Sequence, residues 1–372
     1  MSSLRPLTTI DDPKSLGRVR QLVDQDEIVV HTARLKNRGL LPVALKAALW
    51  AVKPGGHVRI VDDAPRDATA PWEAPANNLN HWVALLSSRD AVRCQPEAGA
   101  GGDIELKRTA SVLAPGWSAG VVFSGRDSEL PQLLACLAGL RAQPELSAAQ
   151  GGEIVVCGPQ RDLAFLDAFP DVRYLVFEMP PGRVMITQKK NALMRSLRGP
   201  RLAVLHTRIV LEPGALAAVP REFDLCSPNT AVIESGRRVP YLSLCATEAF
   251  MPGRTPYDAS HTMRGVRSGD PLELHGRGML FVDGGAFFVT KRLHDDCALD
   301  DTVAWLEGED VEWCLRAQAH GWLVELAPGA GALSQTNKLQ PLPRPGLARA
   351  ASLVWHKLKT VRHGLLQIAG VR

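Results

Sequence analysis

The segment WSAGVVFSGRDSELPQLLACLAGL (117–140) predicts the architecture of the larger part of the chain. It opens with an apolar run, 120–123, which is typical of a buried strand, and the polar Ser124-Gly125-Arg126 that follows is typical of a loop. From 128 to 140 the sequence predicts a helix whose leucines share one face: Leu130, Leu133, Leu134, Leu137 and Leu140. Strand, loop and amphipathic helix in this order predict the first unit of a parallel sheet.

The pattern continues downstream with three more apolar runs, at 153–157, 172–177 and 201–205, each preceded by a helical or polar segment. Strands that alternate with helices over about 90 residues predict an open, mostly parallel α/β sheet. In such sheets ligands bind beyond the carboxyl ends of the strands. The loop that holds Ser124 and Arg126 would therefore lie at a nucleotide site.

Upstream, residues 1–112 predict a second, smaller αβ unit. A strand at 27–30, a helix at 40–52 and a strand at 57–62 form a βαβ unit, with the turn KPGG at 53–56. The stretch QPEAGAGGD (95–103) is rich in Gly and Ala, and predicts a surface loop near the boundary between the two units.

Composition excludes several classes of protein. With 372 residues, 45% hydrophobic and 22% charged, the chain is long enough for a large core and is not disordered. A formal net charge of +4 argues against a nucleic-acid partner. The seven cysteines form no CxxC pair, which argues against a zinc ribbon or a disulfide scaffold. We see neither a signal peptide nor an apolar run long enough to span a membrane, and expect a cytoplasmic protein.

Four segments, in order, resemble the family-2-type glycosyltransferases with the GT-A fold: GVVFSGR (120–126), KKNALM (189–194), LHTRIVLEPGAL (205–216) and, within 282–322, VDGGAFFVTKR with WLEGEDVEWCLRAQAHGW. The resemblance implies a GT-A-like open mixed sheet over 113–338, with a Rossmann-like nucleotide-binding half, preceded by the small partial αβ domain. It also implies that the chain is an inverting glycosyltransferase, which moves a sugar from a nucleotide-diphosphate donor to a hydroxyl of a glycan or lipid-linked acceptor. A role in surface polysaccharide or glycolipid synthesis would follow.

The Glu309-Asp310 pair is the candidate catalytic site. Inverting transfer needs a base that deprotonates the acceptor hydroxyl. The resemblance places this role on Asp310, with Glu309 orienting it or binding acceptor. The alternative is that both are solvent-exposed charges in the first turn of a helix, where the macrodipole favours them.

His206-Thr207-Arg208 stands where the family carries an Asp-x-Asp motif that holds a divalent metal, Mn²⁺ or Mg²⁺. Neither end residue is a carboxylate here. His206 as neutral imidazole could ligate a metal, Arg208 could contact the diphosphate directly, or the site is degenerate. The family's further ligand, a His, would fall near 333–335, which reads Leu-Ser-Gln. The sequence therefore makes a metal doubtful on two counts.

Five more residues are candidates for substrate binding. The resemblance places Lys190 and Asn191 near the nucleotide, with a solvated lysine pair at a helix start as the alternative. Asp283-Gly284-Gly285 precedes a strand at 286–289, and the paired glycines indicate either close approach of a ligand or a hairpin turn.

The segment AALWAVKPGGHVRIVD (47–62) resembles the back half of class I AdoMet-dependent methyltransferases. The chain before Asp26 is too short for that family's Gly-rich cofactor loop. We therefore interpret residues 1–112 as a partial methyltransferase-like region that binds no AdoMet and serves docking or oligomerisation.

Residues 339–372 contain no Asp or Glu. Apolar residues recur there at alternating steps of four and three, which predicts a basic amphipathic helix: Leu347, Ala351, Val354, Leu358, Val361, Leu365 and Ile368. Such a helix would lie on anionic lipid at the inner face of the membrane, or pack on the domain or a partner chain.

Two other functions compete with glycosyl transfer. The missing Asp-x-Asp motif favours a catalytically silent sugar-nucleotide or glycan-binding module, and the KPGG turn alone favours a methyltransferase. A glycoside hydrolase is disfavoured, because that chemistry generally needs two carboxylates flanking the bond and the sequence offers one acidic cluster.

Overall fold

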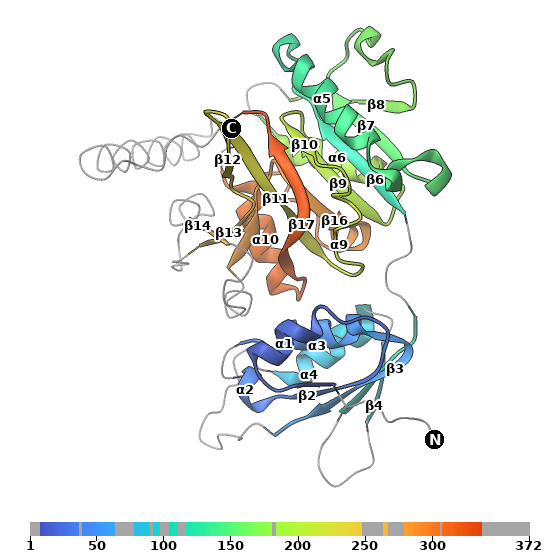
Figure 1. Cartoon of the computed structure of the whole chain (residues 1–372), viewed down its shortest axis with the longest axis vertical. Coiled ribbons are helices and arrows are strands. Elements are labelled where there is room, and N and C mark those ends of the chain that lie inside the picture. Colours follow the sequence, from blue (N-terminus) through green and yellow to red (C-terminus); the bar gives the residue numbers. More distant parts are fainter. Residues whose placement is uncertain are drawn as a thin grey trace, which may run out of the picture.

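The computed structural model describes residues 8–36, 39–63, 78–89, 92–96, 104–110, 116–180, 184–247, 263–266, 279–305 and 307–336. They form a five-stranded sheet, a larger nine-stranded sheet and a small three-stranded sheet. Figure 1 shows the five-stranded unit beside the larger one.

The N-terminal sheet has the order β1-β2-β3-β5-β4, where β1 to β3 are parallel and β5 is antiparallel to both of its neighbours. The bounds are β1 Thr8–Ile10, β2 Gln25–His31, β3 Val52–Val61, β4 Val92–Pro96 and β5 Ile104–Arg108. Helix α3 (Leu41–Ala51) joins β2 to β3, which confirms the predicted βαβ unit. The predicted loop at 95–103 was placed too early, because Gln95 and Pro96 pair with β5.

The KPGG turn is a bulge inside β3. Val52 pairs with Gln25 and His57 with Glu27, so residues 53–56 stand opposite a single residue of β2. Gly55 has φ +86°, which favours glycine, and a Cβ on Gly56 would lie 2.9 Å from the carbonyl oxygen of Asp26. The predicted turn thus lies inside the strand, which begins at Val52 and not at 57, and takes the form of a bulge.

The remaining helices of this unit are α1 Pro13–Val19, α2 Ala33–Lys36 and α4 Leu79–Arg89. Helices α1, α3 and α4 lie between their own sheet and the second unit (Figure 1). Their apolar residues form one core with β2 and β3, which Leu323 of the second unit joins.

The nine-stranded sheet has the order β10-β17-β11-β16-β9-β6-β7-β8, with β12 paired to β11. Strands β9, β6, β7 and β8 are parallel, whereas β16 runs antiparallel to β9 and β11, so the predicted open mixed sheet is confirmed. The bounds are β6 Trp117–Val122, β7 Glu153–Gly158, β8 Val172–Val176, β9 Arg201–His206, β10 Ile209–Leu211, β11 Leu225–Glu234, β12 Arg237–Pro240, β16 Ala286–Thr290 and β17 Val324–Ser334.

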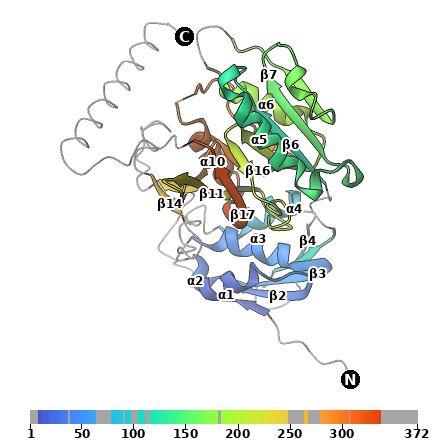
Figure 2. The ribbon, with the colours of Figure 1, turned by 45° about the horizontal axis from the view of Figure 1, so that its top comes forward.

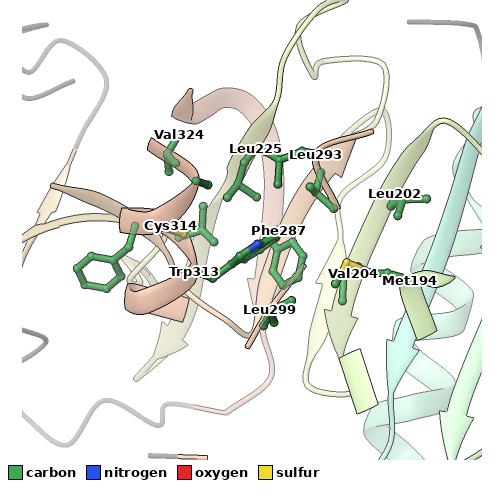
Figure 3. Packing of buried hydrophobic residues seen from close by; sticks show 14 of the residues in the cluster. Met194, Leu202, Val204, Leu225, Phe287, Leu293, Leu299, Trp313, Cys314 and Val324 are labelled. Carbon is green, nitrogen blue, oxygen red and sulfur yellow. The ribbon is translucent and has the colours of Figure 1, made fainter. Parts of the chain in front are cut away.

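Helices cover both faces of this sheet (Figures 1 and 2). Their bounds are α5 Leu130–Arg141, α6 Ile186–Ser196, α9 Lys291–Asp296 and α10 Glu309–Ala319. Successive strand residues point to opposite faces, so Val121 packs on the α5 side and Val122 on the side of α6, α9 and α10. Figure 3 shows Trp313 of α10 against Phe287 of β16, with ring centroids 5.3 Å apart.

The three-stranded antiparallel sheet has the order β14-β13-β15. Its strands are β13 Leu244–Thr247, β14 Met263–Val266 and β15 Leu280–Val282. Gln318 of α10 donates from Nε2 to the carbonyl of Leu280 over 2.7 Å. Helix α10 is therefore held directly against the strand that leads into Asp283-Gly284-Gly285.

Buried charged side chains join the two units. Lys46 of α3 contacts Asp224, which is fully buried and precedes β11. Arg108 pairs with Glu222 over 2.5 Å, and its Nη1 also donates to three carbonyls at the end of α3: Leu49, Trp50 and Val52. These buried ion pairs hold the first unit against the second.

Kinship of the first unit with methyltransferases stays a prediction. The predicted C-terminal helix of residues 339–372 lies outside the described residues. Among the described helices, none is both long and apolar enough to cross a membrane.

Candidate active site

Topology brings the predicted site residues to one edge of the larger sheet. Strands β6 and β9 are parallel neighbours, so the loop at Ser124 and the end of β9 at His206 lie at the same edge. Strand β16 runs the opposite way beside β9, and therefore begins where β9 ends. The N–H of His206 donates to the carbonyl of Gly285 over 2.9 Å.

The paired glycines are required by side chains of the site. A Cβ on Gly284 would lie 2.9 Å from Lys190 Nζ and 3.1 Å from Asp310 Oδ2, and one on Gly285 would lie 2.2 Å from Arg208 Nη2. Neither glycine has a positive φ. The hairpin alternative was wrong, because β15 pairs with β13 while β16 pairs with β9 and β11. Lack of a side chain lets the cluster close around this turn.

Lys190 lies inside the carboxylate cluster. Its side chain is fully buried, and its Nζ lies 3.4 Å from Glu309 Oε1. Lys189 is buried too, so the alternative of a solvated lysine pair was wrong. Helix α6 also begins earlier than expected, at Ile186. Glu309 is 8% exposed, which contradicts the alternative that it is a solvent-exposed helix charge.

Asp310 is partly buried at the first turn of α10, next to Glu309. Its Oδ2 accepts the N–H of Gly284 over 2.9 Å. Burial, followed by the negative charge of Glu309, raises the pKa of Asp310 to about 7, although Lys190 acts in the opposite direction. Burial also raises the pKa of Asp283. A carboxyl group with a pKa near 7 is suited to accept a proton at neutral pH.

Arg208 is 6% exposed and makes two contacts across the site. Its Nη1 lies 3.2 Å from His206 Nδ1, and its Nη2 lies 3.5 Å from Asp283 Oδ2. Arginine offers only donors, so His206 Nδ1 must accept. The imidazole is therefore neutral and carries its proton on Nε2.

The loop that holds Arg208 is braced by Gln335, at the end of β17. The N–H of Gln335 donates to the carbonyl of Arg208 over 2.8 Å, and its Nε2 donates to the carbonyl of Thr207 over 3.2 Å. Residues 333–335 therefore do lie beside the His206–Arg208 loop. Their side chains act there as hydrogen-bonding groups of the protein, which sequence reasoning did not foresee.

These residues do not fit a divalent metal. Both ring nitrogens of His206 are committed, one to Arg208 and the other to its proton. The guanidinium of Arg208 is already paired with Asp283, and Gln335 presents its amide N–H groups to carbonyls. Within the described part of the chain, no group of three or more His, Cys, Asp or Glu residues could hold a metal ion.

Asn191 is engaged by the protein. Its Nδ2 donates to the carbonyl of Leu299 over 2.8 Å and to Asp301 Oδ1 over 2.7 Å, and its Oδ1 accepts the N–H of Leu299 over 3.2 Å. These bonds fix the loop that precedes α10. A direct contact of Asn191 with the nucleotide stays a prediction.

Ser124 and Arg126 are exposed in the loop after β6. Lys189 supports this loop from below, because its Nζ donates to the carbonyl of Phe123 over 2.5 Å. Burial lowers the pKa of Lys189. The structure leaves both loop side chains accessible, as a binding role requires.

Arg161, which sequence reasoning missed, ties the same loop to the one after β7. It donates to the carbonyl of Gly125 and to Asp127 Oδ1, each over 2.9 Å. Its guanidinium lies 5.3 Å from the ring centroid of Phe123 and 5.0 Å from that of Phe165. A basic residue shortly after a buried strand was the available signal.

No protein-family model and no curated protein matches the chain. Among solved structures, the chain is similar to GalNAc-T7, crystallised with UDP, GalNAc and Mn²⁺, at 13% identity and a TM-score of 0.44, over 62% of this chain and 46% of that one.

It is also similar to S. aureus TarS 1–349, alone and with UDP, at 12% identity and a TM-score of 0.40, over 59% of this chain and 60% of that one. The chain thus spans about half to three fifths of these structures. At such values they assign no activity to it.

Proposed function

We propose that the chain is an inverting glycosyltransferase that transfers a sugar from a nucleotide-diphosphate donor to a hydroxyl acceptor, with Asp310 as the base. The observation that carries this proposal is the setting of Asp310. Its carboxyl is fixed by Gly284 and stands at the ligand-binding edge of an open sheet, with a pKa of about 7. Segments that resemble family-2-type glycosyltransferases supply Lys190, Gly284 and Glu309 around it.

In the proposed reaction the acceptor oxygen bonds to the anomeric carbon while the bond from that carbon to the diphosphate oxygen breaks. The hydroxyl proton passes to the Asp310 carboxylate, and the electron pair leaves with the nucleoside diphosphate. Lys190 and Glu309 act as positioning residues for Asp310. Both side chains are buried beside it and contact each other. Ser124 and Arg126, at the end of β6, lie on the donor side.

The second candidate, a silent sugar-nucleotide or glycan-binding module, is favoured by one observation. His206 and Arg208 stand where the family carries carboxylates. Such a module would bind a ligand at the same edge but would have no turnover to lose. For the first unit we propose docking without AdoMet binding, which its buried ion pairs with the second unit support.

Donor binding is tested by thermal shift with a panel of UDP-, GDP-, dTDP- and CMP-sugars. At millimolar ligand we expect at least one donor to raise the unfolding midpoint by several degrees, because a ligand that binds the folded state stabilises it. The matching free sugar serves as the control and should give no comparable shift. Absence of a shift with every donor would exclude the enzyme and the sugar-nucleotide module together.

The rate of nucleoside-diphosphate release is expected to rise with pH through about 7, because Asp310 must be ionised to accept a proton. Glu309→Gln removes a charge that raises the pKa of Asp310, so the midpoint should move to lower pH. Lys190→Met removes a charge that lowers it, so the midpoint should move to higher pH. Initial rates between pH 5 and 9 measure both shifts.

The exposed Asp295 gives the control for these profiles, and Asp295→Asn should leave the midpoint unchanged. If Glu309→Gln and Lys190→Met move the pH midpoint of the rate in the same direction, the group whose ionisation controls the rate is not Asp310.

The C-terminal segment is proposed to bring the chain to a lipid-linked acceptor at the inner membrane face. Vesicles that contain anionic lipid should float the full chain, and a chain without residues 341–372 should stay in the dense fraction, because basic residues and an apolar stripe act together at such surfaces. Neutral vesicles are the control. Equal flotation of both chains would eliminate the membrane role.

A further inference from the structure

Arg208 is a cation held in place by the protein at the site where a sugar-nucleotide diphosphate would lie. Arg208 is only 6% exposed. Among the described residues, its contacts with His206 and Asp283 engage two of its five N–H groups. Within those residues its Nε is buried and has no hydrogen-bond partner. The guanidinium therefore retains donor capacity next to the site.

The position of Arg208 relative to Asp310 suits a role at the leaving group. Gly284 contacts Asp310, and the next residue, Gly285, lies against Arg208 Nη2. Base and guanidinium thus stand at successive residues of one turn. A sugar placed with its acceptor at Asp310 would have its departing phosphate within reach of the Arg208 guanidinium.

We propose that the Arg208 guanidinium takes the place of a divalent metal on the donor diphosphate, so that donor binding and transfer by this chain need no divalent cation. This inference rests on the proposed glycosyltransferase function. The planar fork of arginine matches two phosphate oxygens, and its charge is permanent. It would offset the negative charge that develops on the leaving nucleoside diphosphate, which is the task of a metal ion in such reactions.

The surrounding residues hold the guanidinium in its orientation. Asp283 and His206 fix two edges of the fork, Gln335 braces its backbone, and Gly285 provides the space that a Cβ would fill. The same contacts withdraw His206 from metal coordination. One arrangement thus accounts both for the missing Asp-x-Asp carboxylates and for the glycine.

The test is nucleoside-diphosphate binding by the full chain, measured by thermal shift and calorimetry with UDP, GDP and dTDP, in EDTA and in excess Mn²⁺. We expect the bound nucleotide to have the same affinity within threefold in both conditions. Arg208→Met should weaken the binding of that nucleoside diphosphate at least tenfold, and the binding of the corresponding monophosphate less than threefold. Arg208→Lys keeps the charge without the planar fork, and its affinity for the diphosphate should lie between those of the wild type and Arg208→Met.

Arg221→Met is the matched control, since Arg221 is exposed and pairs with Asp24 away from the site. Binding in Mn²⁺ but not in EDTA would overturn this inference and leave the proposed function standing. Unchanged affinity in Arg208→Met would overturn it as well. No nucleotide binding in either condition would remove the proposed function itself. The comparison of wild-type binding in EDTA and in Mn²⁺ tests the inference even if a variant fails to fold.

Discussion

Replacement of Asp310 by Asn is expected to reduce turnover about 10³-fold while donor affinity stays within about threefold, because general-base catalysis contributes on the order of 10²–10⁴ in rate. Asn keeps an oxygen that accepts the N–H of Gly284, so the turn and helix α10 remain in place. Release of nucleoside diphosphate measures turnover, and the thermal shift with donor measures binding. A silent binding module would show no difference in turnover between the two proteins.

The same substitution is expected to stabilise the fold at high pH. The pKa of Asp310 is about 7 in the folded state, above the ordinary value of 3.8, so the folded protein binds this proton more tightly than the unfolded chain. Ionisation therefore costs stability progressively from about pH 4 to pH 7, and the full cost remains above pH 7. Each pKa unit corresponds to about 1.4 kcal/mol, and solvent access to the carboxyl reduces the total.

We thus expect Asp310→Asn to be more stable than the wild type by about 2 kcal/mol at pH 8, and equal to it near pH 4. Urea unfolding at the two pH values measures the difference. Asp295→Asn, at an exposed carboxylate of α9, is the control and should change stability little at either pH. A variant that is less stable than the wild type at pH 8 would show that the Asp310 carboxylate is a stabilising group.

Lys46→Met is expected to destabilise the protein by about 3 kcal/mol, because it removes one of the cations that compensate the buried Asp224 carboxylate. Lys46 is 2% exposed, lies 4.8 Å from the ring centroid of Trp322 and contacts Asp224, which is fully buried. Asp224 would keep Arg292 at 3.0 Å and the N–H of Leu323 at 2.9 Å. Those contacts keep the cost below that of an isolated charge.

Thermal unfolding at pH 7.5 should show a fall of roughly 5–10 °C in the midpoint. The exposed pair of Arg221 and Asp24, 3.4 Å apart, provides the matched control, and Arg221→Met should stay within about 2 °C of the wild type. The double variant Lys46→Met with Asp224→Asn should recover part of the loss. If Lys46→Met has the same unfolding midpoint as the wild type, the ion pair does not hold the two units together.

The periodic elements follow from local sequence alone. Apolar runs and leucine spacing placed β6, α5, β7, β8 and β9, since period 2 and period 3.6 are properties of local backbone geometry. The sequence also identified the acidic start of α10 at Glu309-Asp310 and the turn glycines at 284 and 285. Each of these signals lies within a few neighbouring residues, so no knowledge of distant parts of the chain was needed.

How those residues act depends on contacts that form only in the folded chain. Lys190 is buried against Glu309, Arg208 occupies the space over Gly285, and Arg161 links two loops that are far apart in sequence. Burial and pairing depend on which strand ends meet at one sheet edge, and a single sequence does not specify those long-range contacts. The sequence therefore gives the charge of each side chain. The environment of that side chain, which sets its pKa and its partners, arises only on folding.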